Sequence, residues 1–148
     1  MAQHLSSYML YFSDGKDTQD LIITHISLLW GSALPCLLFP YYRITEIMFS
    51  GAIFLGISDS FASIVGSRWG KTPFMKGFKS WEGLYAFVAS SVISFGSILY
   101  FYGELGVYNL FICFIVSVIV GFIEAFNRSI DNFVLPYAGY LLLKGALV

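Results

Sequence analysis

The sequence contains little charge, because only 11% of its 148 residues are Asp, Glu, Lys or Arg. An average soluble protein has about 25%. Hydrophobic residues make up 57% of the chain and aromatic residues 19%, and these values predict a membrane protein. The net charge of −1 gives no indication of nucleic-acid binding, and we expect none.

Cysteine is also scarce, and the first 20 residues lack an apolar core. Cys36 and Cys113 each lie inside an apolar stretch, where a lone thiol acts as a small hydrophobic group, so no disulfide framework is expected. Residues 1–20 carry several charges and match neither a signal peptide nor an Arg-rich transit peptide. We expect them to form a cytosolic N-terminal segment.

The long apolar stretches predict an all-α fold, a polytopic membrane helix bundle over residues 21–148 with about five transmembrane helices. At 1.5 Å per residue, three uncharged stretches are long enough to cross about 30 Å of hydrocarbon. These are Leu21 to Tyr42, Gly83 to Gly103 and Leu105 to Ile123. Two further apolar segments carry charge: Ile44 to Gly66 contains Glu46 and Asp59, and Ile130 to Val148 contains Asp131 and Lys144.

Half of the eight cations lie in one loop, residues 66–83, which reads GSRWGKTPFMKGFKSWEG. Cations are retained on the cytosolic side of a membrane, so this basic loop is predicted to face the cytosol. Alternation of the spans then places Glu46 and Glu104 at the far end. The acids predicted at the same end as the loop are Asp59, Glu82, Glu124 and Asp131.

Two stripes of residues run along the segment that precedes the basic loop. Ser58, Ala62, Gly66 and Gly70 repeat every four residues, a pattern of small residues that lets another helix approach closely. Asp59, Ser63 and Ser67 form a polar stripe beside them. An acid about 10 Å inside a span is costly unless it serves a site, so Asp59 is a candidate functional residue.

The basic loop and the neighbouring acids together suit a phosphorylated ligand. The segment GSRWGKT is not a P-loop, because only three residues separate Gly66 from Gly70, but Lys, Arg and Gly side by side suit a polyphosphate. Mg²⁺ is held by one or two carboxylates together with phosphate oxygens. Without such a ligand, the loop would serve only membrane topology and attraction to anionic lipid headgroups.

Three motifs in this order resemble the C-terminal catalytic region of the dolichol kinases, the CTP-dependent polyprenol kinases of the endoplasmic reticulum. The motifs read SDSFASIVGSRWGK, KSWEG and EAFNRSIDNFVLP, and the resemblance covers roughly residues 20 to 143. Ser58 stands where the family commonly has glycine, and Ser80 where it has threonine. Dolichol kinases carry many more spans upstream, so the chain corresponds to about their last third.

The resemblance implies transfer of the γ-phosphoryl group of CTP to dolichol, which gives the dolichyl phosphate used in protein glycosylation. It implies a multi-pass protein of the endoplasmic reticulum membrane with its nucleotide site facing the cytosol. Residues 66–83 would form the nucleotide-binding loop, through Arg68, Gly70, Lys71, Lys76, Lys79, Ser80, Glu82 and Gly83. The catalytic acids would be Asp59, Glu82, Glu124 and Asp131. Of these, Asp59, Glu124 and Asp131 would hold Mg²⁺, unless one of them, most plausibly Asp131, accepts the hydroxyl proton.

Other functions fit parts of the same pattern. The motifs also resemble phytol kinases and, more distantly, phosphatidate cytidylyltransferases. A non-catalytic membrane subunit, or an ion relay through Asp59 and Glu124, would not need the basic loop. Binding of CTP that depends on magnesium would distinguish the kinase from the relay.

Overall fold

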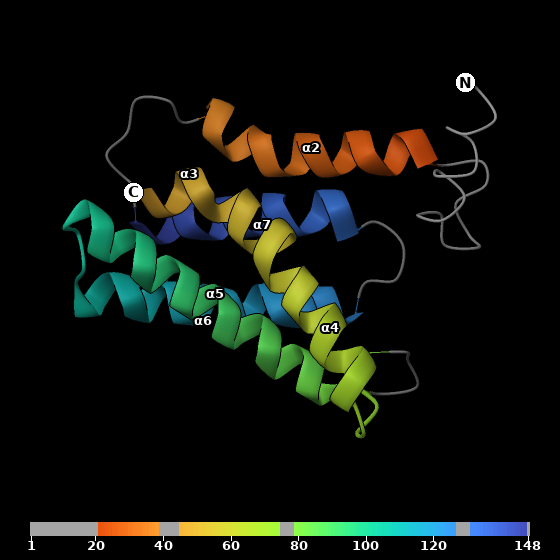
Figure 1. The fold of residues 1–148 in the computed structure, drawn as a ribbon. Coiled ribbons are helices and arrows are strands. Elements are labelled where there is room, and N and C mark those ends of the chain that lie inside the picture. Colours follow the sequence, from red (N-terminus) through yellow and green to blue (C-terminus); the bar gives the residue numbers. More distant parts are fainter. Residues whose placement is uncertain (1–20, 39–44, 75–78, 127–130, 148) are drawn as a thin grey trace.

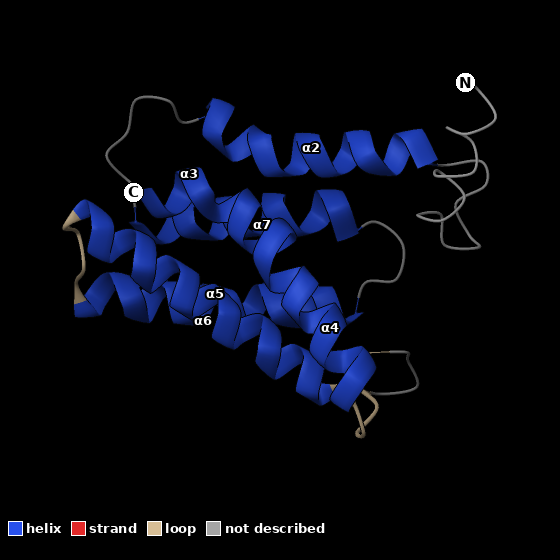
Figure 2. Ribbon diagram, viewed as in Figure 1, coloured by secondary structure: helices blue, strands red, loops and turns tan. Residues whose placement is uncertain are grey.

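The protein is a bundle of helices with no strand among the residues described (Figure 2). The computed structural model describes residues 21–38, 45–74, 79–126 and 131–147. The α-helices are α2 (Leu21–Leu38), α3 (Thr45–Gly51), α4 (Asp59–Trp69), α5 (Trp81–Tyr102), α6 (Val107–Phe126) and α7 (Asp131–Leu147). A π-helix, η1 (Ala52–Ser58), lies between α3 and α4. The predicted all-α fold is confirmed.

Three helices in the described part of the chain are long and apolar enough to cross a membrane: Glu46–Trp69, Trp81–Tyr102 and Val107–Phe126. The first combines α3, η1 and α4 into one bent helix, so the charged segment 44–66 belongs to a helix that is long and apolar enough to span a membrane (Figure 1). Of the predicted span 21–42, α2 covers Leu21–Leu38, and residues 39–42 lie outside the described part. Both α2 and α7 contain shorter apolar helices, Leu28–Leu37 and Val134–Leu147.

A tight turn makes α5 and α6 an antiparallel pair. Gly103 has φ 71°, a left-handed conformation that glycine adopts without steric cost. The amide of Glu104 then donates to the carbonyl of Leu99 at 2.9 Å, which satisfies an end carbonyl of α5. The two helices lie side by side in Figure 1, so the start of α5 and the end of α6 share one end of the bundle.

The core centres on Phe54 in η1. Its ring is stacked 6.0 Å from that of Phe87 and meets that of Phe95 edge-on at 5.4 Å, both on α5. On the other side it lies against Gly139 of α7, where an added Cβ would come 2.5 Å from Phe54 Cε2. This packing fixes where the bent helix crosses α5 and α7.

The bundle has two distinct ends. At one end the ring of Phe49 lies 6.3 Å from that of Tyr102, and Glu46 is close enough to Glu104 to interact electrostatically. At the other end α4 packs against the start of α5, next to the end of α6. The structure thus separates Glu46 and Glu104 from the basic loop, as alternation of the spans predicts.

Candidate functional site

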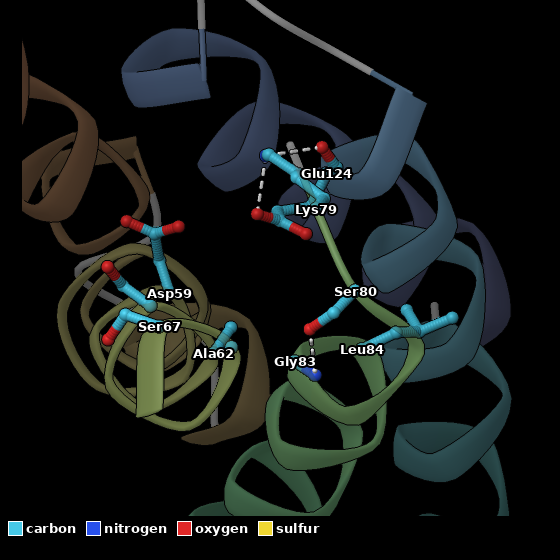
Figure 3. A pocket seen from close by; sticks show the side chains of 10 residues that line it. Asp59, Ala62, Ser67, Lys79, Ser80, Gly83, Leu84 and Glu124 are labelled. Carbon is cyan, nitrogen blue, oxygen red and sulfur yellow. Dashed lines mark hydrogen bonds and ion pairs between the residues drawn. The ribbon is translucent and has the colours of Figure 1, made fainter. Parts of the chain in front are cut away.

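A polar cavity of about 310 Å³ lies between α4, the start of α5 and the end of α6. Its volume is at the lower end of the range for small-molecule sites, about 300 to 1,000 Å³. Figure 3 shows that three parts of the sequence contribute to it. The lining residues are Asp59, Ala62, Ser63, Gly66, Ser67, Lys79, Ser80, Gly83, Leu84 and Glu124.

The α4 wall confirms both stripes predicted from the sequence. Asp59, Ser63 and Ser67 all line the cavity. The small-residue stripe contacts α5: a Cβ added to Gly83 would lie 3.1 Å from the carbonyl oxygen of Ala62. The small-residue stripe therefore packs against α5, and two of its members, Ala62 and Gly66, also line the cavity together with the polar stripe.

The π-helix ends immediately before Asp59. The amide of Asp59 donates to the carbonyl of Phe54, which lies five residues back instead of the four of an α-helix. The extra residue in this turn changes the direction in which the following side chains point. In the residue before Asp59, the hydroxyl of Ser58 accepts a hydrogen bond at 2.7 Å from the hydroxyl of Ser91 on α5. The orientation of Asp59 is thus set by η1 and by this buried contact. Neither the π-helix nor this contact was predicted from the sequence.

Ser80 is the N-cap of α5 and lines the cavity. Its hydroxyl accepts the amide of Gly83 at 3.2 Å, which is the N-cap interaction favoured by serine. Gly70 packs directly on this side chain, since an added Cβ would come 2.6 Å from Ser80 Oγ. Gly70 does not line the cavity, so its observed role is close packing at the end of α4.

The ends of the basic loop pair with each other. The amide of Phe74 donates to the carbonyl of Lys79 at 2.7 Å, and the amide of Trp81 donates to that of Thr72 at 3.1 Å. The carboxylate of Glu82 accepts the hydroxyl of Thr72 at 2.8 Å and its amide at 3.2 Å. The Phe74 ring is buried against Trp81 and Phe126. These contacts hold the backbone of Lys79 in place.

Lys79 forms an ion pair with Glu124 across the cavity from Asp59 (Figure 3). The ammonium donates to Glu124 Oε1 at 2.5 Å and to the backbone carbonyl of the same residue at 2.6 Å. The Glu124 side chain is only 8% exposed, whereas that of Lys79 is 30% exposed. The pair joins the loop to the last turn of α6, where the carbonyls favour a cation.

The cavity brings together five of the predicted site residues: Asp59, Lys79, Ser80, Gly83 and Glu124. Arg68 and Lys71 are exposed outside the lining, and Glu82 contacts Thr72 instead. Lys76 lies outside the described residues, as does the side chain of Asp131, the first residue of α7. Sequence analysis did not place Leu84 at the site, although it lies one residue after the predicted Gly83.

The donor set suits a divalent cation bound together with a phosphate. Asp59 and Glu124 provide carboxylates from different helices on one cavity. The described residues include no cluster of three or more His, Cys, Asp or Glu that could hold a metal on its own. Mg²⁺ is commonly bound through one or two carboxylates and phosphate oxygens, so the cavity fits this ion if a ligand supplies the phosphates.

Comparison with known proteins shows similarity to dolichol kinases. The human dolichol kinase is 31% identical over 149 residues, which are 94% of this chain and 27% of that protein. Dolichol kinase EVAN of Arabidopsis thaliana is 31% identical over 155 residues, 97% of this chain and 26% of its own length. Dolichol kinase sec59 of Schizosaccharomyces pombe is 30% identical over 144 residues, which are 95% of this chain and 28% of that protein.

The chain spans about a quarter of the length of these curated relatives, somewhat less than the third expected from the motifs. The matched part is a C-terminal region of the longer proteins, which confirms the resemblance found in the sequence. Neither a protein-family model nor a solved structure matches the chain.

Proposed function

Because this chain is related to a C-terminal region of the dolichol kinases, we propose that it carries the nucleotide site of a CTP-dependent polyprenol kinase. The reaction transfers the γ-phosphoryl group of CTP to the terminal hydroxyl of dolichol, and it yields dolichyl phosphate and CDP. The product serves protein glycosylation.

One observation carries this proposal. The three motifs that resemble dolichol kinases are far apart in the sequence, and each contributes to the same cavity: Asp59 from the first, Lys79 with Ser80 and Gly83 from the second, and Glu124 from the third. Helix packing alone does not require two carboxylates and a lysine to converge on one polar cavity. An ion relay would not need Lys79 or the other cations of the loop.

The residues have roles that fit phosphoryl transfer, which depends mainly on positioning and charge stabilisation. Lys79 lies where its ammonium can bind the phosphates, and the exposed Arg68 and Lys71 add positive charge outside the cavity lining. Asp59 and Glu124 would hold Mg²⁺, which neutralises the charge of the phosphates when it is bound. Asp131 remains the proposed acceptor of the hydroxyl proton.

The proposed location is the endoplasmic reticulum membrane, with the cavity at the cytosolic end. Its support is the concentration of cations in the loop beside the cavity, since cations are retained in the cytosol. CTP would then reach the cavity from the water phase, while dolichol approaches within the bilayer.

The direct test uses two preparations of CTP, one labelled with ³²P at the γ phosphate and one at the α phosphate, in membranes that contain this chain and dolichol. The proposed kinase transfers ³²P from the γ position to the lipid, whereas a cytidylyltransferase would transfer it from the α position. Failure of both labels to reach the lipid, in membranes where the chain is folded, would contradict catalysis by this chain.

Two lysines provide a matched comparison in the same assay. Lys79→Ala should abolish most of the γ-label transfer, because it removes the cation from the cavity. Lys144→Ala makes the same substitution in the last turn of α7, where the ammonium lies 5.9 Å from the centre of the Tyr140 ring, and should be nearly silent. Equal losses in the two variants would count against the assigned site.

A further inference from the structure

We propose that the ion pair between Lys79 and Glu124 excludes free divalent cations from the cavity, so that the metal enters only together with a nucleoside triphosphate. This inference rests on the proposed function and deepens it, because it assigns Lys79 a second role. Lys79 would bind phosphate when the nucleotide is present and protect Glu124 when the nucleotide is absent.

The first support is the geometry of the pair. Lys79 donates both to the carboxylate and to the backbone carbonyl of Glu124, so the ammonium has two acceptors on one residue. Because the Glu124 side chain is only 8% exposed, water and salt screen this attraction poorly. A cation that approaches Glu124 therefore meets an ammonium already bound at Oε1, which repels it.

The second support is the charge of the cavity. Its lining contains two acids, Asp59 and Glu124, and one cation, Lys79. With Lys79 on Glu124, a metal ion that approached Asp59 would be repelled by the ammonium on the opposite side of the same cavity. No larger group of potential ligands exists among the described residues. The cavity without nucleotide is therefore a poor metal site.

A nucleotide would change this balance because its phosphates offer the ammonium other anionic acceptors. Lys79 exchanges the carboxylate for a phosphate oxygen, so it does not lose its charged hydrogen bonds. Glu124 then becomes available to the metal that the phosphates bring with them. The backbone of Lys79 stays fixed by its hydrogen bond with Phe74, so only the side chain has to move.

The test measures binding of Mn²⁺ to the whole chain by electron paramagnetic resonance, in nanodiscs of zwitterionic lipid that do not themselves attract the ion. The wild-type chain should bind Mn²⁺ with CTP and show no saturable binding without it. Lys79→Gln should bind Mn²⁺ saturably without CTP, at least about tenfold more tightly than the detection limit set by the wild type, because no charged hydrogen bond has to be broken first. Adding Asp59→Asn or Glu124→Gln to this variant should remove that binding.

Lys71→Gln is the matched control, because it removes the same charge from the basic loop at an exposed position outside the cavity lining. It should not bind Mn²⁺ in the absence of CTP. Equal gains in Lys71→Gln and Lys79→Gln would show a general effect of loop charge and overturn the proposal.

Two further outcomes separate this inference from the proposed function. If Lys79→Gln melts at a lower temperature but gains no metal binding, while the wild type still binds Mn²⁺ with CTP, the pair is only a structural contact and the inference fails. If the folded wild type binds no Mn²⁺ even with CTP, the proposed nucleotide site itself fails.

Discussion

Asp59 and Glu82 illustrate how differently two acids of one predicted site are used. Both are candidates from the sequence, since each lies in a motif next to cations or small residues. Asp59 lines the cavity opposite Glu124, whereas Glu82 accepts hydrogen bonds from both the amide and the hydroxyl of Thr72 in the loop. The first position suits metal binding and the second suits support of the loop.

Asp59→Asn should reduce transfer of phosphate to dolichol by at least about 100-fold, because it removes a metal ligand but retains the shape of the side chain. The protein should still insert, and its melting temperature should stay the same or rise, since an acid inside a span is costly. Activity and thermal unfolding are measured on one preparation.

Glu104→Gln is the control for this substitution, because it neutralises an acid just after α5 at the opposite end of the bundle. Its activity should stay close to that of the wild type. If Asp59→Asn retained activity with unchanged dependence on magnesium, Asp59 would have no part in metal binding.

Glu82→Gln and Thr72→Val should have similar effects, and the loss in the double variant should be smaller than the sum of the two. Glu82→Gln removes the charge of the acceptor and Thr72→Val removes the hydroxyl donor, so both weaken the same contact between α5 and the loop, and coupled residues are not additive. We expect a higher KM for CTP and a smaller change in kcat in steady-state kinetics. A large loss of kcat on adding Glu82→Gln to Thr72→Val would instead show direct participation of Glu82 in catalysis.

The crossing of α4 and α5 determines the width of the cavity. Glycine at position 83 lets the backbone of α4 approach, and the hydrogen bond between Ser91 of α5 and Ser58, the last residue of η1, adds a second contact next to this crossing. The π-helix η1 precedes this crossing and changes the direction of the residues that follow it. These elements carry no group that reacts, but they set the distance between Asp59 and the opposite wall.

Gly83→Leu should force α4 and α5 apart and weaken CTP binding, with a loss of stability of about 1–3 kcal/mol, typical of overpacked sites. Ala89→Leu adds the same side chain to an exposed position of α5 and should leave both properties unchanged. Thermal unfolding and nucleotide binding in detergent would measure the two effects. Equal behaviour of the two variants would contradict the close approach at Gly83.

The whole bundle places the polar cavity at one end and the Glu46 and Glu104 carboxyl groups at the other. The bent helix, α5 and α6 are each long enough to cross the membrane, and the shorter α2 and α7 pack together beside them. The orientation of this bundle in the membrane follows from the proposed cytosolic position of the basic loop.

Cysteine labelling tests this orientation in a variant without Cys36 and Cys113. A thiol reagent that cannot cross membranes should label Lys71→Cys from the cytosolic side. Val107→Cys, at the exposed start of α6, should react only after the membrane is made permeable. The reverse pattern would place the cavity in the lumen, and labelling of both positions from one side would contradict the bundle itself.

Most of the fold could be predicted from the sequence, because long uncharged stretches have few structures open to them in a bilayer. Backbone polar groups must be paired within the segment, so helices over 83–103 and 105–123 were expected and are confirmed to within a few residues. The spacing of four residues also predicted correctly that Ala62 and Gly66 pack closely and that Asp59 lies on a polar stripe.

The partners of individual side chains depended on the tertiary structure. Charge and motif spacing predicted that Lys79, Glu82 and Glu124 lie at one end of the bundle. They did not predict that Lys79 pairs with Glu124 while Glu82 contacts Thr72. These contacts depend on how the loop folds back on α6 and how η1 turns α4. Both result from packing between segments far apart in the sequence, which a local pattern does not encode.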